Sequence, residues 1–231
     1  LEAVGDLPAR CRVSARVAPE VGIEVWLPEP GWNGKLLVAG CYGLCGSIRA
    51  DQMEDAAARG YATATTDGGH SDREYPDSRW AWNNPPLETD FGHRAVHVTA
   101  VLAKALVVAF YGSPATQAYF RGCSTGGRQA LVAAGRYPED FDGIVAGDPA
   151  YHLTHLQAGS EYLSWVALKD GSNAPAFLPP AKYPVLHRAV LDACDAKDGV
   201  RDGAIEDPTR CNFDPASIQC PGPDQLSCLT P

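Results

Sequence analysis

A serine lies at the centre of the most distinctive stretch of this sequence, Gly122-Cys123-Ser124-Thr125-Gly126-Gly127. The spacing Gly-x-Ser-x-Gly is that of a nucleophile elbow, in which a strained turn between a strand and a helix lifts a serine hydroxyl above a sheet. Residues 118–121 have the apolar and aromatic character of a short strand, and 129–136 carry Ala and Leu at helical spacing. A chance match in a glycine-rich loop is the alternative. We predict that Ser124 is a nucleophile.

A nucleophilic serine needs N–H groups that stabilise the negative oxygen formed when it attacks a carbonyl. The first amide of the predicted helix, that of Thr125, is one expected donor. A second is expected from a glycine-rich turn after an earlier strand, and Gly43, which follows the strand predicted at 35–40, suits this role. Gly69 is the competing donor, and an ordinary strand-end turn is the other interpretation of Gly43.

The serine also needs a base, usually a histidine that is oriented by a carboxylate. The histidines that follow it in the chain are His152, His155 and His187. The first two come too soon after the strand predicted at 143–147, and the third lies in a predicted helix over 183–193. Asp148 could pass for the acid, although a role in a turn is favoured. The sequence therefore shows a nucleophile without a convincing base.

The elements that must position Ser124 are strands and helices in alternation, which is typical of an α/β fold with a mostly parallel sheet. Strands are predicted at 21–28, 35–40, 61–67, 118–122 and 143–147, and helices at 51–59, 90–111 and 129–136. From Tyr151 the sequence is richer in proline and holds four of the eight cysteines. We expect a catalytic core over 1–150 and a second domain or large insertion over 151–231.

Composition excludes some partners. The net charge of −9 argues against nucleic-acid binding, which needs a basic face. No apolar run approaches the roughly 20 residues of a membrane span, and 96–111, interrupted by Lys104, is predicted to be a buried helix.

The eight cysteines have no zinc-type spacing and favour disulfides over metal binding, and therefore secretion or periplasmic export. Residues 1–6 lack the features of a signal peptide and the first residue is not Met. We expect a mature or excised piece of a longer product.

An acidic loop suggests a metal site in the second half. Asp195, Asp198 and Asp202, with glycines between them, can place oxygens around a calcium ion, which accepts roughly 6–8 such ligands in irregular geometry. The spacing is not that of an EF-hand, and a solvated acidic turn is the alternative. Cys194 and Cys211 flank the loop, and a bridge between them would close it. We predict a structural Ca²⁺ ion here.

Together these features amount to a family resemblance. The run Gly122-Cys123-Ser124-Thr125-Gly126-Gly127-Arg128 resembles the nucleophile motif of the tannase and feruloyl esterase family, and the cysteine beside the serine is its most specific part. Other similar stretches are Trp32-Asn33-Gly34, Thr66-Asp67-Gly68-Gly69-His70, Tyr137-Pro138, Phe141-Asp142-Gly143-Ile144-Val145-Ala146-Gly147 and the aspartate loop. The resemblance implies an α/β-hydrolase core with a lid inserted after 143–147. It also implies a secreted serine carboxylesterase that cleaves small-molecule esters of feruloyl or galloyl type through an acyl-enzyme.

Carried to this chain, the resemblance implies that Ser124 is the nucleophile and that Gly43 and Thr125 are the oxyanion donors. The implied calcium ligands are the carboxylates of Asp195, Asp198 and Asp202 and the carbonyls of Val200 and Ala204. The implied lid disulfides are Cys194–Cys211 and Cys220–Cys228, while Cys41 and Cys45 fit the family less clearly and could pair with each other.

The resemblance also exposes a departure. In this family Cys123 would bridge to a cysteine beside the catalytic histidine, and this sequence has no His-Cys pair. Cys11 similarly matches a cysteine whose partner lies upstream. We therefore expect a chain truncated at both ends, which lacks the triad acid and histidine and is inactive alone. A non-catalytic calcium-stabilised module, and a hydrolase that acts on peptides or as an acyltransferase, are the alternatives.

Overall fold

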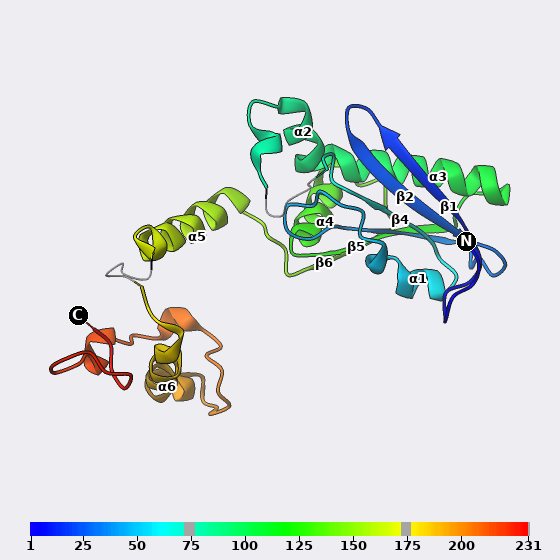
Figure 1. Ribbon diagram of the computed structural model, residues 1–231. Helices are drawn as coiled ribbons and strands as arrows, with labels where there is room; N and C mark the ends of the chain where they lie inside the picture. The colour runs from blue at the N-terminus through cyan, green and yellow to red at the C-terminus, as the bar shows by residue number, and fades with distance from the viewer. Residues whose placement is uncertain (72–76, 172–176, 231) are drawn as a thin grey trace. The chain divides into compact units, whose positions relative to one another are not determined.

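The computed structural model describes residues 1–71, 77–171 and 177–230 (Figure 1). The chain forms two compact units, Leu1–Leu156 and Gln157–Pro231. The boundary expected at 150/151 falls shortly before this division, and helix α5 (Leu153–Leu168) runs across it.

A mixed, mostly parallel sheet forms the first unit (Figure 1). Its strands run in the spatial order β1-β2-β4-β3-β5-β6, with β4, β3, β5 and β6 mutually parallel and β1 and β2 antiparallel to their neighbours. The bounds are β1 (Arg10–Val17), β2 (Val21–Pro28), β3 (Lys35–Ala39), β4 (Ala62–Thr66), β5 (Gln117–Cys123) and β6 (Gly143–Gly147). The predicted α/β class is confirmed.

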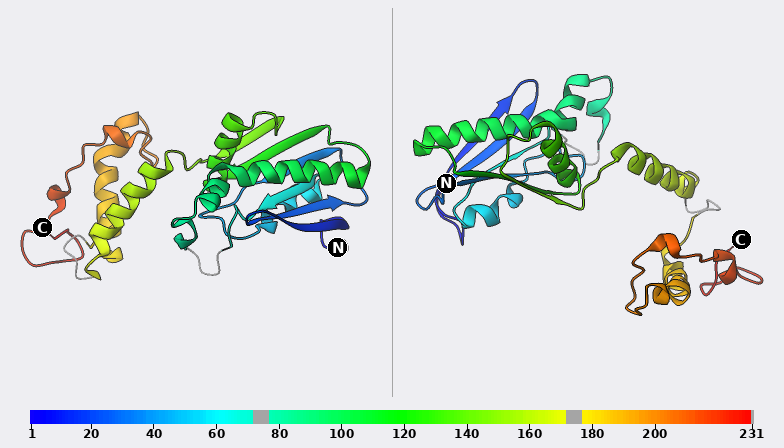
Figure 2. Two further views of the ribbon diagram at one scale, coloured as in Figure 1. Left: turned by 90° about the horizontal axis from the view of Figure 1, so that it is seen from above. Right: turned by 180° about the vertical axis from the view of Figure 1, so that it is seen from behind.

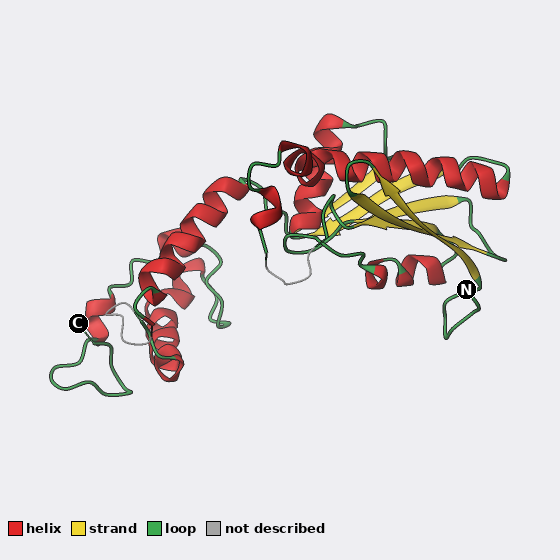
Figure 3. Cartoon of the chain, turned by 45° about the horizontal axis from the view of Figure 1, so that its top comes forward, coloured by secondary structure: helices red, strands yellow, loops and turns green. Residues whose placement is uncertain are grey.

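Helices cover both faces of this sheet, with α3 and α4 on one side and α1 on the other (Figures 2 and 3). The bounds are α1 (Glu54–Ala58), α2 (Pro85–Thr89), α3 (Ala95–Tyr111) and α4 (Thr125–Arg136), with short turns η1 (Ala50–Gln52), η2 (Arg79–Ala81) and the π-helical η3 (Asp90–Arg94). The helix predicted over 90–111 consists of two segments, the π-helical η3 and the α-helix α3.

The core follows the two-residue period of the strands. Ile23 and Val25 of β2 lie in the apolar cluster that includes residues of α3 and α4, whereas Trp26 packs with Met53 and Ala57 on the α1 side. Because both faces of the central strands are covered, every residue of β2 and β4 is buried, including Glu24 and the threonines of β4.

Strand β1 was not predicted, although its sequence alternates apolar residues with Arg and Ser. It lies at the sheet edge, where only one face is partly buried, so its apolar content is low.

One helical run in the described residues, Pro85–Tyr111, is long and apolar enough to cross a membrane by length and composition. Within it, Val96, Ala100, Ala103 and Val107 of α3 are buried in the sheet cluster at helical spacing, as in a core helix. The predicted buried helix at 96–111 agrees with this packing.

The second unit depends on cross-links more than on an apolar core. It contains most of α5, then α6 (Tyr183–Cys194) and the short turns η5 (Pro180–Lys182), η6 (Asp195–Asp198), η7 (Pro208–Arg210) and η8 (Pro215–Ile218). Among its described residues only Lys182, Cys194 and Cys228 are buried, and Lys182 forms an ion pair with Asp224. Disulfides join Cys194 to Cys211 and Cys220 to Cys228, as the resemblance implied.

A buried carboxylate at the end of β4 makes the stability of the first unit depend on pH. Asp67 is 5% exposed, and its Oδ1 accepts the N–H groups of Gly22 and Gly69, both at 2.9 Å. Burial raises the pKa of Asp67 above its ordinary value, while the two N–H groups lower it in part. The unfolded chain therefore ionises at lower pH than the folded one, so this group destabilises the fold increasingly as pH rises through that interval.

We expect Asp67→Asn to remove this penalty while its side-chain oxygen still accepts both N–H groups. Urea denaturation at several pH values measures the free energy of unfolding of the variant and of the unmodified protein. The difference, variant minus unmodified, should increase from pH 3 to neutrality and then level off. Asp55→Asn is the control with opposite sign, because Arg121 lowers the pKa of Asp55. A difference for Asp67→Asn that does not change with pH would contradict this account.

Candidate active site

Ser124 lies between β5 and α4 in a strained backbone conformation, with φ 59° and ψ −119°. Such angles are rare for a residue with a Cβ and occur where the surroundings impose them. Here the Ser124 N–H donates to the Gly147 carbonyl and the Ser124 carbonyl accepts the Ala150 N–H, both at 3.1 Å. The last residue of β6 and the turn that follows it therefore hold the Ser124 backbone on both sides.

Glycines allow the start of α4 to approach the neighbouring backbone. A Cβ on Gly127 would lie 2.3 Å from the Gly147 carbonyl oxygen and 2.7 Å from the Pro149 Cα. A Cβ on Gly122 would lie 2.4 Å from the Gly126 carbonyl oxygen. The predicted strand–serine–helix arrangement is thus present, and its glycines are required by close packing.

The loop Gly40–Cys45, which we call the oxyanion loop, lies beside the start of α4. The Thr125 hydroxyl donates to the Gly43 carbonyl at 2.5 Å, and a disulfide joins Cys41 to Cys45. Among the residues that the structure describes, neither the Gly43 N–H nor the Thr125 N–H has an acceptor. Two unpaired backbone donors beside a half-buried serine are what an oxyanion hole requires.

The competing donor is engaged elsewhere. The Gly69 N–H donates to Asp67 Oδ1 at 2.9 Å, so it is not available to a substrate. This geometry favours Gly43 over Gly69 as the second donor.

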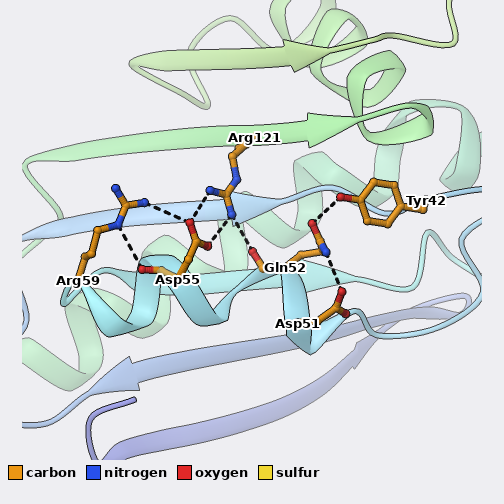
Figure 4. Close-up of polar contacts among 6 residues, drawn as sticks. All are labelled: Tyr42, Asp51, Gln52, Asp55, Arg59 and Arg121. Atoms are coloured by element: carbon orange, nitrogen blue, oxygen red, sulfur yellow. Dashed lines mark hydrogen bonds and ion pairs between the residues drawn. The ribbon is translucent and has the colours of Figure 1, made fainter. Parts of the chain in front are cut away.

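A polar network supports the oxyanion loop from the α1 side of the sheet (Figure 4). The Tyr42 hydroxyl donates to Gln52 Oε1 at 2.7 Å, and Arg121 of β5 donates to the Gln52 carbonyl at 3.1 Å. Arg121 also binds both carboxylate oxygens of Asp55 at 2.7 Å. The loop and the strand that leads to Ser124 are therefore anchored to the same short segment.

Arg128, one turn after Ser124, ties α4 to the π-helical segment η3. Its guanidinium donates to the carbonyls of Phe91 and Gly92 at 3.0 and 3.1 Å and lies 4.6 Å from the centre of the Phe91 ring. Burial of the guanidinium lowers the pKa of Arg128 below its ordinary value.

The described structure supplies no base for Ser124. His152 and His155 are exposed, and their rings contact each other with a centroid distance of 6.1 Å. No described histidine hydrogen-bonds to the Ser124 hydroxyl. His187 lies on α6 in the second unit and is exposed. Asp148 is exposed in a left-handed turn with φ 38°.

Cys123 and Cys11 are unpaired in this chain, and Cys123 is exposed beside Ser124. This agrees with the absence of a His-Cys pair from the sequence. The pairing of Cys41 with Cys45, which the sequence left open, is confirmed.

The acidic loop is ordered by its own carboxylates. Asp195 accepts the Gly203 N–H at 3.2 Å, Asp198 accepts the Val200 N–H at 2.9 Å, and Asp202 accepts the Ala204 N–H at 3.0 Å. Within the described parts of the chain, no three acidic, His or Cys side chains converge as metal ligands would. The calcium site remains a prediction.

One buried polar residue of the site was missed in the sequence. Gln129 is 4% exposed and hydrogen-bonds to both ends of the oxyanion loop. The sequence did contain a sign of this role: Gln129 is a polar residue on the face of α4 that also carries the small buried residues Gly126, Ala130 and Ala133.

Comparison with known proteins identifies relatives along the whole chain. A family model described as tannase and feruloyl esterase matches residues 2–231. An uncharacterised esterase of Xanthomonas campestris is 42% identical over 97% of this chain and 39% of its own length. A probable feruloyl esterase B-2 of Aspergillus flavus is 35% identical over 96% of this chain and 42% of its own.

Among solved structures, feruloyl esterase B from Aspergillus oryzae matches 96% of this chain with a TM-score of 0.83 and 32% identity. The match covers 44% of that protein. The chain therefore spans about two-fifths of the length of the curated relatives it matches.

The glycine packing gives a stability prediction. Gly127→Ala should destabilise the protein by about 1–3 kcal/mol, because its Cβ meets backbone atoms that cannot turn aside. Gly135→Ala on the same helix meets nothing within 4 Å and should stabilise by about 0.4–1 kcal/mol. Urea denaturation of both variants tests this, and equal effects would contradict the packing account.

Proposed function

Because the chain belongs to the tannase and feruloyl esterase family, we propose that it carries the nucleophile half of a serine carboxylesterase for esters of aromatic or phenolic acids. The observation that supports this most is the position of Ser124, which is held in a strained turn beside two unpaired N–H groups. The probable feruloyl esterases among the relatives favour hydroxycinnamoyl esters as substrates.

The proposed reaction proceeds through an acyl-enzyme. The Ser124 hydroxyl oxygen attacks the ester carbonyl carbon as a base takes its proton, and the carbonyl oxygen becomes negative. The N–H groups of Thr125 and Gly43 donate to this oxygen, and the N-terminal end of the α4 dipole stabilises its charge. Collapse of the intermediate expels the alcohol, which receives the proton from the base. Water then attacks the acyl-serine in the same manner and releases the acid.

We propose that the triad acid and the base are supplied by residues outside 1–231. Two observations support this: no described histidine reaches Ser124, and the chain spans 39–44% of its relatives. Residues 1–231 alone should then react slowly with covalent reagents, such as fluorophosphonates, that need an activated serine.

Two further parts of the proposal concern the setting of the enzyme. Three disulfides in one chain favour an oxidising compartment, so secretion or periplasmic export is proposed. A structural calcium ion at 195–204 is proposed on the chemistry of its donors: the carboxylates of Asp195, Asp198 and Asp202 and the carbonyls of Val200 and Ala204.

Ser124→Ala in the full-length natural protein should lower kcat on methyl ferulate by about 10³-fold or more, since the attacking atom is removed. The Tm should change little, because the strained backbone is held by main-chain bonds. Turnover that survives the substitution would reject Ser124 as the nucleophile.

A panel of substrates and a covalent probe separate the alternatives. A preference for anilide substrates would indicate an amidase instead of an esterase. A preference for transfer of the acyl group to added alcohols would indicate an acyltransferase. A fluorophosphonate probe labels an activated serine, so an unlabelled full-length protein would indicate a non-catalytic module.

Calcium is tested by chelation. We expect excess chelator to lower the Tm of the unmodified protein and added Ca²⁺ to restore it. Asp198→Asn should reproduce the loss and no longer respond to the ion. A Tm that chelator leaves unchanged would reject the calcium site.

A further inference from the structure

Gln129 is a buried amide whose two ends both bind the oxyanion loop. Its Oε1 accepts the Cys41 N–H at 3.2 Å, and its Nε2 donates to Cys45 Sγ at 3.7 Å. A disulfide joins these two cysteines and closes the loop that contains Gly43. Gln129 therefore hydrogen-bonds to both residues of the disulfide that closes this loop. Because Gln129 lies on α4, it connects this loop to the helix that begins directly after Ser124.

On the side that faces α4, close contacts with the helix leave the oxyanion loop little room to move. The Thr125 hydroxyl donates to the Gly43 carbonyl, and a Cβ on Gly126 would lie 3.0 Å from the Cys41 carbonyl oxygen. A Cβ on Gly40 would lie 3.0 Å from Gln129 Oε1 and 2.8 Å from the Gly126 Cα. The amide of Gln129 is thus fitted between the helix and the loop without spare space.

The opposite side of the loop is held less directly. There the Tyr42 hydroxyl binds Gln52 in the network of Figure 4, at the end of a long side chain that is only partly buried. Of the two supports, the one from Gln129 contacts the backbone N–H of Cys41, two residues before Gly43, and is buried.

We propose that Gln129 is a positioning residue that fixes the Gly43 N–H relative to Ser124, so that both oxyanion donors are in place before substrate binds. This inference rests on the proposed esterase function and adds to it a residue that does not contact substrate. An apolar side chain at this position leaves the buried Cys41 N–H without an acceptor, and the loop relieves this by moving. A displacement of about 1 Å at a catalytic group can cost on the order of 100-fold in rate.

The test compares Gln129→Met with the unmodified enzyme in the full-length natural protein. Methionine keeps the length of the side chain but neither hydrogen bond. We expect kcat on methyl ferulate to fall by about 10–100-fold with KM within about threefold, because the donor acts on the transition state. Binding of an arylboronic acid, which forms a tetrahedral adduct with the serine, should weaken by a similar factor, while inhibition by ferulic acid should not change.

Two variants separate positioning from general stability. Thr99→Val removes one buried hydrogen bond, from the Thr99 hydroxyl to the Ala95 carbonyl in α3, and should lower the Tm without lowering kcat. Gln129→Glu keeps an acceptor for the Cys41 N–H but loses the donor to Cys45 Sγ, so its kcat should lie between those of Gln129→Met and the unmodified enzyme. If the Gln129→Met variant does not fold, kcat and boronate affinity of Gln129→Glu test the positioning role instead.

The outcomes distinguish the two proposals. An unmodified enzyme without turnover or Ser124 labelling overturns the proposed function and this inference with it. An active enzyme whose Gln129→Met or Gln129→Glu variant keeps both kcat and boronate affinity overturns the positioning role alone. An equal loss of kcat in Thr99→Val also overturns it, since the effect would then be one of stability.

Discussion

Close packing of backbone against backbone at the start of α4 is the constraint on which the site depends. Gly127 lies against Gly147, the last residue of β6, and against Pro149 in the turn after it. The Ser124 N–H and carbonyl are bonded to the same segment, at Gly147 and Ala150. With strand and helix fixed in this way, the residue between them has no relaxed conformation available. The strain at Ser124 is therefore imposed by the sheet and maintained by the stability of the first unit.

The same constraint organises the groups around the serine. Because α4 begins so close to β3 and β6, Thr125 and Gln129 reach the oxyanion loop directly, and Arg128 reaches η3 on another side. The helix is thus a common support for Ser124 and for the loop that carries Gly43. A change in the loop and a change in the helix should have related consequences for the chemistry.

Much of this arrangement could be predicted from the sequence, because it depends on local patterns. β2 was predicted with its observed bounds, since alternation and a closing proline mark it, and the elbow was predicted from its glycines. The class of fold followed from buried strands in alternation with helices. The pairing of Cys194 with Cys211, which lie 17 residues apart around a loop, was implied by the family resemblance.

The parts that were missed depend on contacts between distant residues. Gln129 and Cys41 are 88 positions apart, so only the fold shows that the amide serves the loop. By contrast, the Gly69 N–H donates to Asp67 only two positions earlier, in a local turn that the pattern of residue types does not specify. Helix α5 was not predicted because none of its described residues is buried, and an apolar stripe is what reveals a helix in a sequence.

The most direct test of the account is a crystal structure of the full-length protein after reaction with an aryl phosphonate. The account predicts a covalent bond from phosphorus to Ser124 Oγ, with the phosphonyl oxygen about 2.7–3.1 Å from the N–H nitrogens of both Gly43 and Thr125. An adduct on another residue, or a phosphonyl oxygen that is turned away from these two nitrogens, would contradict it.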